Sequence, residues 1–189
     1  MNIFVLDKDP QYAAVMMCDK HVVKMIVESC QLMSTAHHVL DGKQITRVSK
    51  NGRKFSTYEA ANLLGVPPFL RCTMINHPCT IWTRETVENY QWLWVHTNEL
   101  LYQYNARYNK DHTYTNLVRQ TLVNCPQHLQ RIKLTPFAQA MPDQYKNQDT
   151  AEAYRQYYIH EKSRFAKWKM GNTPLWFTEG VNSINTVQA

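Results

Sequence analysis

From about Gln11 to Leu40, apolar residues recur with the period of an α-helix. An amphipathic helix normally confines its apolar side chains to one face, but here they occupy most of the circumference. Asp41-Gly42 follows and ends the pattern, as glycine commonly does after a helix. The sequence therefore predicts one long, mostly buried helix.

Three further helices are expected downstream. Pro78 suits the first turn of a helix, and a second long helix can run from about Thr80 to Tyr108. A shorter helix is expected over residues 112–123. The last helix should run from about Asp149 to Trp168, with the Asp149 side chain as its N-cap.

A small β-hairpin is expected between the two long helices. Ser49–Arg53 contains Asn-Gly between β-forming residues, which is the strongest short-range hairpin signal. One or two helical turns are expected over Tyr58–Leu64. Residues after Gly180 have the composition of a disordered tail. The fold prediction is mainly α: a single compact helical domain over residues 1–180, with two long helices, a C-terminal helix and a small β-hairpin, and a disordered tail over 181–189.

Charge and aromatic content favour nucleic acid as the partner. The formal charge of the 189 residues is +6, and aromatic residues make up 12% of the chain. A basic surface attracts polyanions, and flat side chains can stack on exposed bases. The alternative is a basic domain that binds nothing acidic.

The chain has no apolar run long enough to span a membrane, and Met1–Pro10 lacks the pattern of a signal peptide. Its 5 cysteines are odd in number and widely spaced, unlike a disulfide framework. We therefore expect free thiols, a cytoplasmic location (the host cytoplasm if a phage encodes the chain), no membrane contact and no obligate protein partner.

One polar strip interrupts the apolar surface of the first long helix. Within the strip, His21 and Glu28 lie two turns apart with Lys24 between them, which is suitable chemistry for acid–base work. The alternative is a solvated face with a Lys24–Glu28 ion pair. The strip contains Lys20, His21, Lys24, Glu28, Gln31, Thr35 and His38.

Three short motifs in this sequence resemble the phage pyrimidine-dimer DNA glycosylase (endonuclease V) family. The first is Asp19-Lys20-His21 with Glu28 seven residues after the histidine. The second is His77 ahead of the second long helix, and the third is Pro174–Phe177 near the C-terminus. The chain is also similar to uncharacterised phage and bacterial proteins that share stretches such as Cys18–Met25.

The resemblance implies a specific chemistry. In that family an N-terminal α-amine attacks C1′ of a damaged pyrimidine nucleotide, a Schiff base forms, and β-elimination can cut the strand. The essential glutamate of the first helix matches Glu28, and the upstream histidine matches His21. An α-amine has a reference pKa of about 7.7–8.0, so part of it is neutral at physiological pH.

This sequence departs from the family pattern at the nucleophile and beside the glutamate. The family enzyme begins with a small residue after removal of methionine, whereas Asn2 follows Met1 here, so the amine belongs to Met1 or Asn2. The two arginines that flank the family's glutamate correspond to Val27 and Gln31. Lys24 is a candidate replacement for one of them.

Further residues are candidates for nucleic-acid binding. Arg84, near the start of the second long helix, is the preferred phosphate ligand, and capping or surface ion pairing is the alternative. Arg155, Lys162 and Lys169 repeat every seven residues, which predicts a basic line along a phosphate backbone or else a solvated face. The full set of nucleic-acid candidates is Lys20, Gln31, Asn76, His77, Arg84, Arg155, Lys162, Lys169 and Trp176.

No cofactor or metal is expected. A structural zinc bound by Cys18, His21, His77 and Cys79 is an alternative, but neither half matches a common zinc signature. Glu161 falls in the apolar stripe of the last helix, so it needs a partner such as Lys24 or Arg84, or belongs to a site.

The sequence thus favours a DNA glycosylase, with an optional AP-lyase step, that acts on a damaged or modified pyrimidine. The expected catalytic residues are Glu28, His21, Lys24 and the amine of Met1 or Asn2. Two alternatives stay open. One is a phage DNA base-modifying or nucleotide-processing enzyme on the same scaffold, and the other is a non-enzymatic DNA-binding protein.

Overall fold

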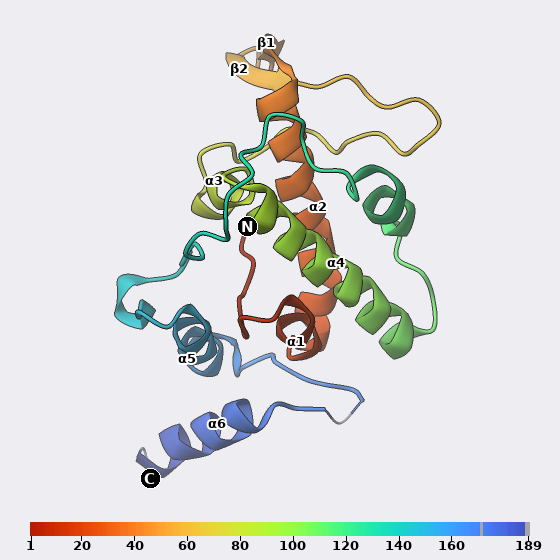
Figure 1. Ribbon diagram of the computed structural model, residues 1–189. Helices are drawn as coiled ribbons and strands as arrows, with labels where there is room; N and C mark the ends of the chain where they lie inside the picture. Colours follow the sequence, from red (N-terminus) through yellow and green to blue (C-terminus); the bar gives the residue numbers. More distant parts are fainter. Residues whose placement is uncertain (171, 188–189) are drawn as a thin grey trace.

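The computed structural model describes residues 1–170 and 172–187, and it confirms a mainly α chain with one antiparallel hairpin (Figure 1). In chain order the elements are α1 (Pro10–Val15), α2 (Asp19–Asp41), β1 (Lys43–Val48), β2 (Lys54–Glu59), α3 (Pro78–Thr83), α4 (Val87–Tyr108), the π-helix η1 (Leu117–Thr121), the 3-10 helix η2 (Asp143–Tyr145), α5 (Thr150–Lys162) and α6 (Leu175–Val187).

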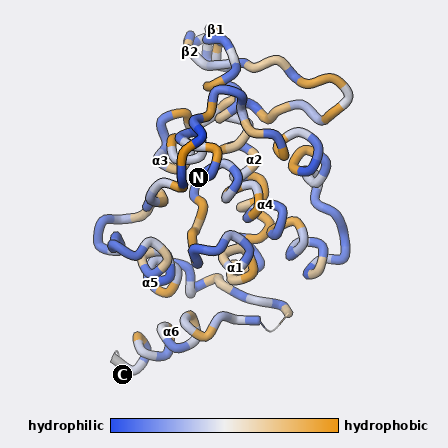
Figure 2. Tube along the Cα trace, in the orientation of Figure 1, coloured by the Kyte–Doolittle hydropathy of each residue, from blue (hydrophilic) through white to orange (hydrophobic). Residues whose placement is uncertain are grey.

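Two long helices form the centre of the fold. α2 packs across α4, α1 packs against α4, and α3 packs against α2, while α5 and α6 form a second pair (Figure 1). An extended N-terminal segment runs between these groups and is mostly apolar (Figure 2). Ile3, Val5 and Leu6 in this segment are at most 1% exposed, so the start of the chain is part of the core.

The first long helix is broken, contrary to the single helix predicted over Gln11–Leu40. α1 ends at Val15, and α2 begins at Asp19. The carbonyl groups that the break leaves unpaired have side-chain partners: Arg107 donates to the oxygens of Val15 and Met17, and Trp168 Nε1 donates to that of Met16. A helix end is stable when such groups are satisfied, and these donors come from distant parts of the chain.

The second long helix is broken as well, contrary to the prediction of one helix over Thr80–Tyr108. Thr86 adopts an extended conformation, and its hydroxyl caps α4 by accepting from the backbone N–H of Asn89. The Asn89 side chain in turn donates to the carbonyl of Trp82 at the end of α3. The two residues therefore satisfy both helix ends at the break.

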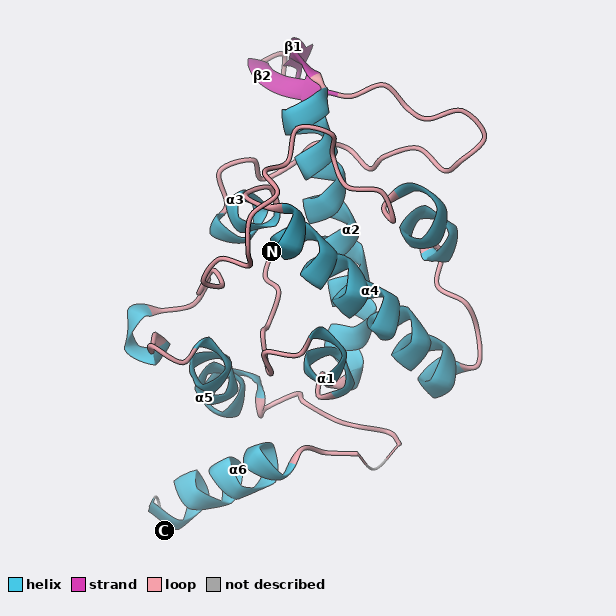
Figure 3. Ribbon diagram, viewed as in Figure 1, coloured by secondary structure: helices cyan, strands magenta, loops and turns pink. Residues whose placement is uncertain are grey.

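The predicted hairpin is confirmed. β1 pairs with β2 in antiparallel register from Lys43↔Glu59 to Val48↔Lys54, and Gly52 takes a positive φ of 77° in the connecting turn. The hairpin extends from the C-terminal end of α2 (Figure 3). The helical turns predicted over Tyr58–Leu64 are wrong, because Tyr58 and Glu59 belong to β2 and no helix follows before α3.

The C-terminal region differs from the prediction in length. Asp149 is the N-cap of α5, as predicted, with its carboxylate accepting from Ala151 N, but α5 ends at Lys162 rather than at Trp168. Helical structure expected over 112–123 is reduced to a short turn around η1. α6 continues to Val187 through most of the predicted disordered tail, of which residues 188–189 lie outside the described part of the chain.

Candidate active site

Glu28 lies at the centre of the candidate site. Its side chain, on the polar strip of α2, is only 12% exposed. Oε2 accepts a hydrogen bond of 2.9 Å from the backbone nitrogen of Asn2, and Oε1 lies 3.2 Å from Nζ of Lys24. The carboxylate is therefore held between the start of the chain and a lysine of its own helix.

The Asn2 side chain fixes the start of the chain relative to the helices. Its Nδ2 donates to the carbonyl of Ala140 at 2.8 Å, and its Oδ1 accepts from the backbone nitrogens of Ile3 and Phe4. Phe4, at a positive φ of 54°, stacks its ring on His21 with 4.4 Å between centroids. These contacts place the first residues of the chain beside α2.

His77 borders the same site from α3. It is the N-cap of α3, and its Nδ1 accepts from Cys79 N. Partial burial lowers the pKa of His77, and the positive charge of the N-terminal amine lowers it further, while the negative charge of Glu28 opposes both. Burial raises the pKa of Cys79 to about 12, with smaller influences from the same amine and carboxylate. The Met1 amine, Glu28 and His77 therefore lie within electrostatic reach of one another.

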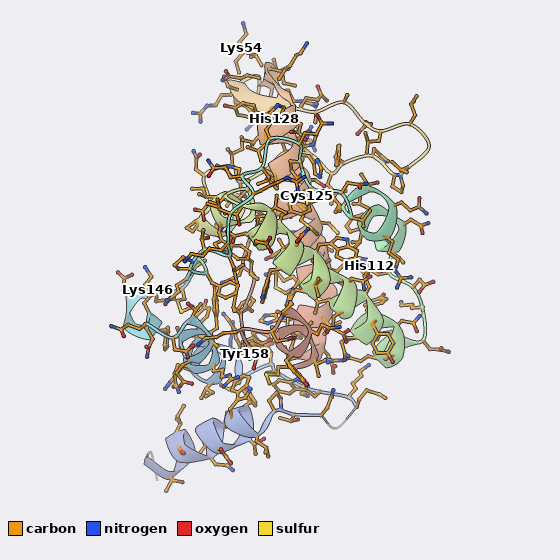
Figure 4. All side chains as sticks on the ribbon, in the orientation of Figure 1. Lys54, His112, Cys125, His128, Lys146 and Tyr158 are labelled. Atoms are coloured by element: carbon orange, nitrogen blue, oxygen red, sulfur yellow. The ribbon has the colours of Figure 1, made fainter. Side chains whose placement is uncertain are left out.

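His21 lies within the aromatic core. Its Nδ1 is hydrogen-bonded to the hydroxyl of Tyr158, which α5 contributes (labelled in Figure 4), and its ring meets Phe165 edge-on. Burial lowers the pKa of His21 to about 3, with further lowering by the charges of Lys162 and Lys24. The imidazole is thus neutral at physiological pH.

Lysines surround the exposed end of the strip. The side chain of Lys24 is 64% exposed, and Lys162 of α5 stacks over the Tyr157 ring. Lys20 and Lys169 border a hollow of about 440 Å³ beside the start of α2. The hollow is lined by Asp19, Lys20, Val23, Tyr108, Phe165, Lys167 and Lys169.

Several predicted nucleic-acid ligands have internal partners instead. Arg84 donates to the carbonyl of Ile75 at 2.7 Å, and burial lowers its pKa. Arg155 donates to the carbonyl of Leu6 and pairs with the carboxylate of Asp7 at 3.2 Å. The basic line predicted through Arg155, Lys162 and Lys169 is therefore interrupted at its first member.

The remaining candidates differ in exposure. Gln31 is partly exposed one turn beyond Glu28, and Asn76 is exposed next to His77. Trp176 is partly buried, with its ring 5.7 Å from the Arg155 guanidinium and edge-on to Tyr158. Glu161 has neither of its predicted partners: it is exposed and accepts from the hydroxyl of Tyr145 at 2.8 Å.

Sequence reasoning missed the buried ion pair that fixes the first motif. Asp19 Oδ1 lies 3.1 Å from Nη1 of Arg107, and its Oδ2 accepts from the backbone nitrogen of Lys169. Arg107 is at the end of α4, eighty-eight positions away in the chain. No local pattern marks this pairing, so only the fold reveals that Asp19 has a structural role.

The alternative zinc site does not form within the described residues. Tyr158 donates to Cys18 Sγ, and its oxygen also contacts His21. Across residues 1–170 and 172–187, no group of three or more histidine, cysteine, aspartate or glutamate side chains has a metal-binding arrangement. None of the described helices is long and apolar enough to cross a bilayer.

Comparison with known families agrees with the geometry. A family model described as pyrimidine dimer DNA glycosylase matches residues 1–116. The chain belongs to this family, whose members are DNA-repair glycosylases, so its substrate is DNA. The match includes Glu28, His21 and His77, whereas the resemblance at Pro174–Phe177 lies outside it. Comparisons with curated proteins and with solved structures give no match.

Proposed function

We propose that this chain excises a damaged or modified pyrimidine from DNA through its N-terminal α-amine, with Glu28 as the acid–base residue. The hydrogen bond between Asn2 N and Glu28 Oε2 supports this most directly. If Met1 is removed, this nitrogen becomes the α-amine and is already in contact with the carboxylate. If Met1 is retained, the amine is one residue farther away but still close enough to lower the pKa of His77.

The proposed reaction begins with attack of the neutral amine on C1′ of the nucleotide. The glycosidic bond breaks, its electron pair leaves with the base, and the base takes up a proton. Glu28 accepts the proton lost from the amine and stabilises the positive charge on the sugar. As the sugar ring opens, Glu28 gives this proton to O4′, so that a protonated Schiff base forms between the amine and C1′ and the carboxylate is ionised again.

The same intermediate permits the lyase step. Loss of a C2′ proton, with Glu28 as the base, breaks the bond from C3′ to the 3′ phosphate, so that the strand is cut by β-elimination. Water then hydrolyses the Schiff base and regenerates the amine. A single carboxylate can serve both steps because it is protonated and deprotonated in turn.

The surrounding residues would bind and orient the DNA. Lys24 holds Glu28 and contributes positive charge beside the sugar. His21 acts as a positioning residue, because its neutral ring is buried between Phe4 and Tyr158. Phosphate and base contacts would come from the exposed and partly exposed members of the candidate set, namely Lys20, Gln31, Asn76, Lys162 and Lys169.

Borohydride trapping tests the proposal. The protein would be mixed with labelled duplexes that carry an abasic site, a thymine dimer or a hydroxymethylated pyrimidine, reduced, and mapped by mass spectrometry. We expect an adduct on the α-amine of residue 1 or 2, which Glu28→Gln abolishes and the matched exposed change Glu88→Gln leaves intact.

The other outcomes distinguish the alternatives. Intact DNA binding without an adduct on any substrate would refute amine catalysis. A base change without an adduct would then identify a base-modifying enzyme. If Glu28→Gln altered no activity while DNA still bound, the chain would be a binding module.

A further inference from the structure

The β-hairpin carries an excess of positive charge that the proposed reaction does not use. Between Lys43 and Glu59 the chain has five basic side chains and one acidic one. The acidic residue, Glu59, pairs with Arg47 at 2.6 Å. None of the ion pairs among the described residues includes the other basic residues, which are Lys43, Lys50, Arg53 and Lys54.

These charges lie on an exposed arm. Lys50, Arg53 and Lys54 are exposed at and beside the hairpin turn, and Lys54 is labelled at the end of the molecule opposite Tyr158 (Figure 4). The arm consists of two short strands paired only with each other at the end of α2. A solvated two-stranded arm with this charge has the features of a surface that binds a polyanion.

A groove links the hairpin to the candidate active site. It has a volume of about 700 Å³, with Phe55, Ser56 and Thr57 of β2 on one side and residues 72–78 on the other. The lining of the groove includes His77, on whose pKa the charges of the N-terminal amine and Glu28 act. A second hollow, lined in part by Arg47 and Arg71, adjoins the groove through Phe55 and Thr57.

The length of α2 sets the spacing between the two regions. Glu28 and the last residue of α2, Asp41, are 13 positions apart, which corresponds to ~20 Å along a helix. B-DNA rises 3.4 Å per base pair, so this separation spans about 6 base pairs. A duplex that presents a nucleotide to Glu28 and runs along α2 would therefore reach the hairpin.

We infer that the hairpin is a DNA-binding arm that contacts phosphates of the duplex about 6 base pairs from the nucleotide at Glu28. Lys50 and Arg53 supply the phosphate contacts at the turn, and the groove carries the intervening strand from His77. The inference rests on the proposed function for the position of the target nucleotide. Binding by the arm requires no reaction and is measured separately.

The double variant Lys50→Ala/Arg53→Ala tests whether the hairpin binds DNA. The double variant Lys110→Ala/Arg119→Ala is the matched control. Both pairs comprise one exposed lysine and one exposed arginine, so the loss of formal charge is equal. Affinity for a duplex with a central reduced abasic site would be measured across salt concentrations. We expect the hairpin variant to bind roughly tenfold more weakly at low salt, with a salt slope shallower by about 2.

Duplex length supplies a second readout. Trimming one flank from about 10 to about 3 base pairs should weaken wild-type binding and leave the hairpin variant unchanged. If the hairpin variant and the control variant lost equal affinity, or if the hairpin variant and the wild type were equally sensitive to trimming, the DNA-binding role of the hairpin would be refuted, whatever the result of borohydride trapping.

If the wild-type protein gave no trapped adduct but the hairpin variant still bound DNA more weakly, only the proposed chemistry would be refuted. A wild-type protein that binds no duplex would refute both proposals.

Discussion

The backbone nitrogen of Asn2 donates a 2.9 Å hydrogen bond to Oε2 of Glu28, twenty-six positions later in the chain. This bond joins the start of the chain to the middle of α2. It brings the start of the chain, where the proposed nucleophile lies, beside the proposed acid–base residue.

Extending the chain by two residues ahead of Met1 should move the α-amine away from Glu28. A misplacement of about 1 Å can reduce a rate about 100-fold, and two residues move the amine farther than this. We therefore expect trapping on an abasic duplex to fall at least ~100-fold. The matched control appends the same two residues after Ala189. Undiminished trapping in the first variant would exclude the α-amine as the nucleophile.

Lys24 should affect activity much more than stability. The lysine is largely exposed, and an exposed ion pair stabilises a fold by at most about 1 kcal/mol. We expect Lys24→Met to unfold in urea close to the wild-type midpoint but to trap DNA roughly tenfold more slowly, since charge beside the sugar is lost. Lys24→Arg should recover most of the rate. A Lys24→Met protein with wild-type kinetics would assign the lysine to the surface alone.

The Asp19–Arg107 pair should be important for stability. Both side chains are nearly buried, and Arg107 also satisfies the carbonyl groups at the break between α1 and α2. Loss of one partner leaves the other charge buried, which costs about 3–5 kcal/mol. Urea unfolding of Arg107→Met should show this loss. Arg119→Met, at an exposed position, should stay within about 0.5 kcal/mol of wild type.

His96 should make the fold less stable in acid. Burial lowers its pKa from 6.5 to about 3, and neither ring nitrogen has a partner among the described residues. Below pH 6.5 the unfolded chain binds a proton that the native imidazole does not, so stability falls as the pH drops from 7 toward 3. Between pH 7 and pH 5, this one histidine lowers the free energy of unfolding by about 2 kcal/mol.

The variant His96→Phe should remove this contribution to the pH dependence of stability, because phenylalanine cannot be protonated. Its ring can keep the stacking on Trp92. Urea unfolding at pH 7 and pH 5 would measure the difference. The exposed change His160→Phe is the control and should leave the pH dependence as in the wild type. An unchanged pH dependence in His96→Phe would show that this imidazole titrates in the native protein.

Local sequence signals predicted the elements whose causes are local. Asn51-Gly52 predicted the hairpin turn, and Asp149 predicted the start of α5, because each acts on its own backbone. The pattern of α2 also placed Lys24 and Glu28 on one strip, where they form an i,i+4 pair. Helical spacing alone is enough for such a prediction.

Features that depend on distant side chains were not predictable in this way. The break before α2 depends on Arg107 and Trp168, and the break before α4 depends on Thr86 together with Asn89. His21 belongs to the polar strip by spacing, yet Phe4 covers it from the start of the chain. A helical wheel contains no information on which face another segment will cover.

Gly180 lies inside a helix, where the absence of a side chain permits close packing. Glycine commonly occurs at a helix end, and the composition of the residues after Gly180 predicts a disordered tail. In the structure α6 continues through it, and a Cβ at this position would lie 2.4 Å from Cδ1 of Ile159. The missing side chain therefore permits close packing of α6 on α5 rather than ending the helix.

The bond from the Asn2 side chain to the carbonyl of Ala140 has a consequence for the order of events during synthesis. The two residues are 138 positions apart. A ribosome that adds about 5–20 residues per second takes ~7–28 s to make this length of chain. Until Ala140 emerges, the first residues lack one of their anchors and are open to an aminopeptidase. The relative rates of aminopeptidase cleavage and of folding of the nascent chain would then determine whether Met1 is removed, and so which residue carries the amine.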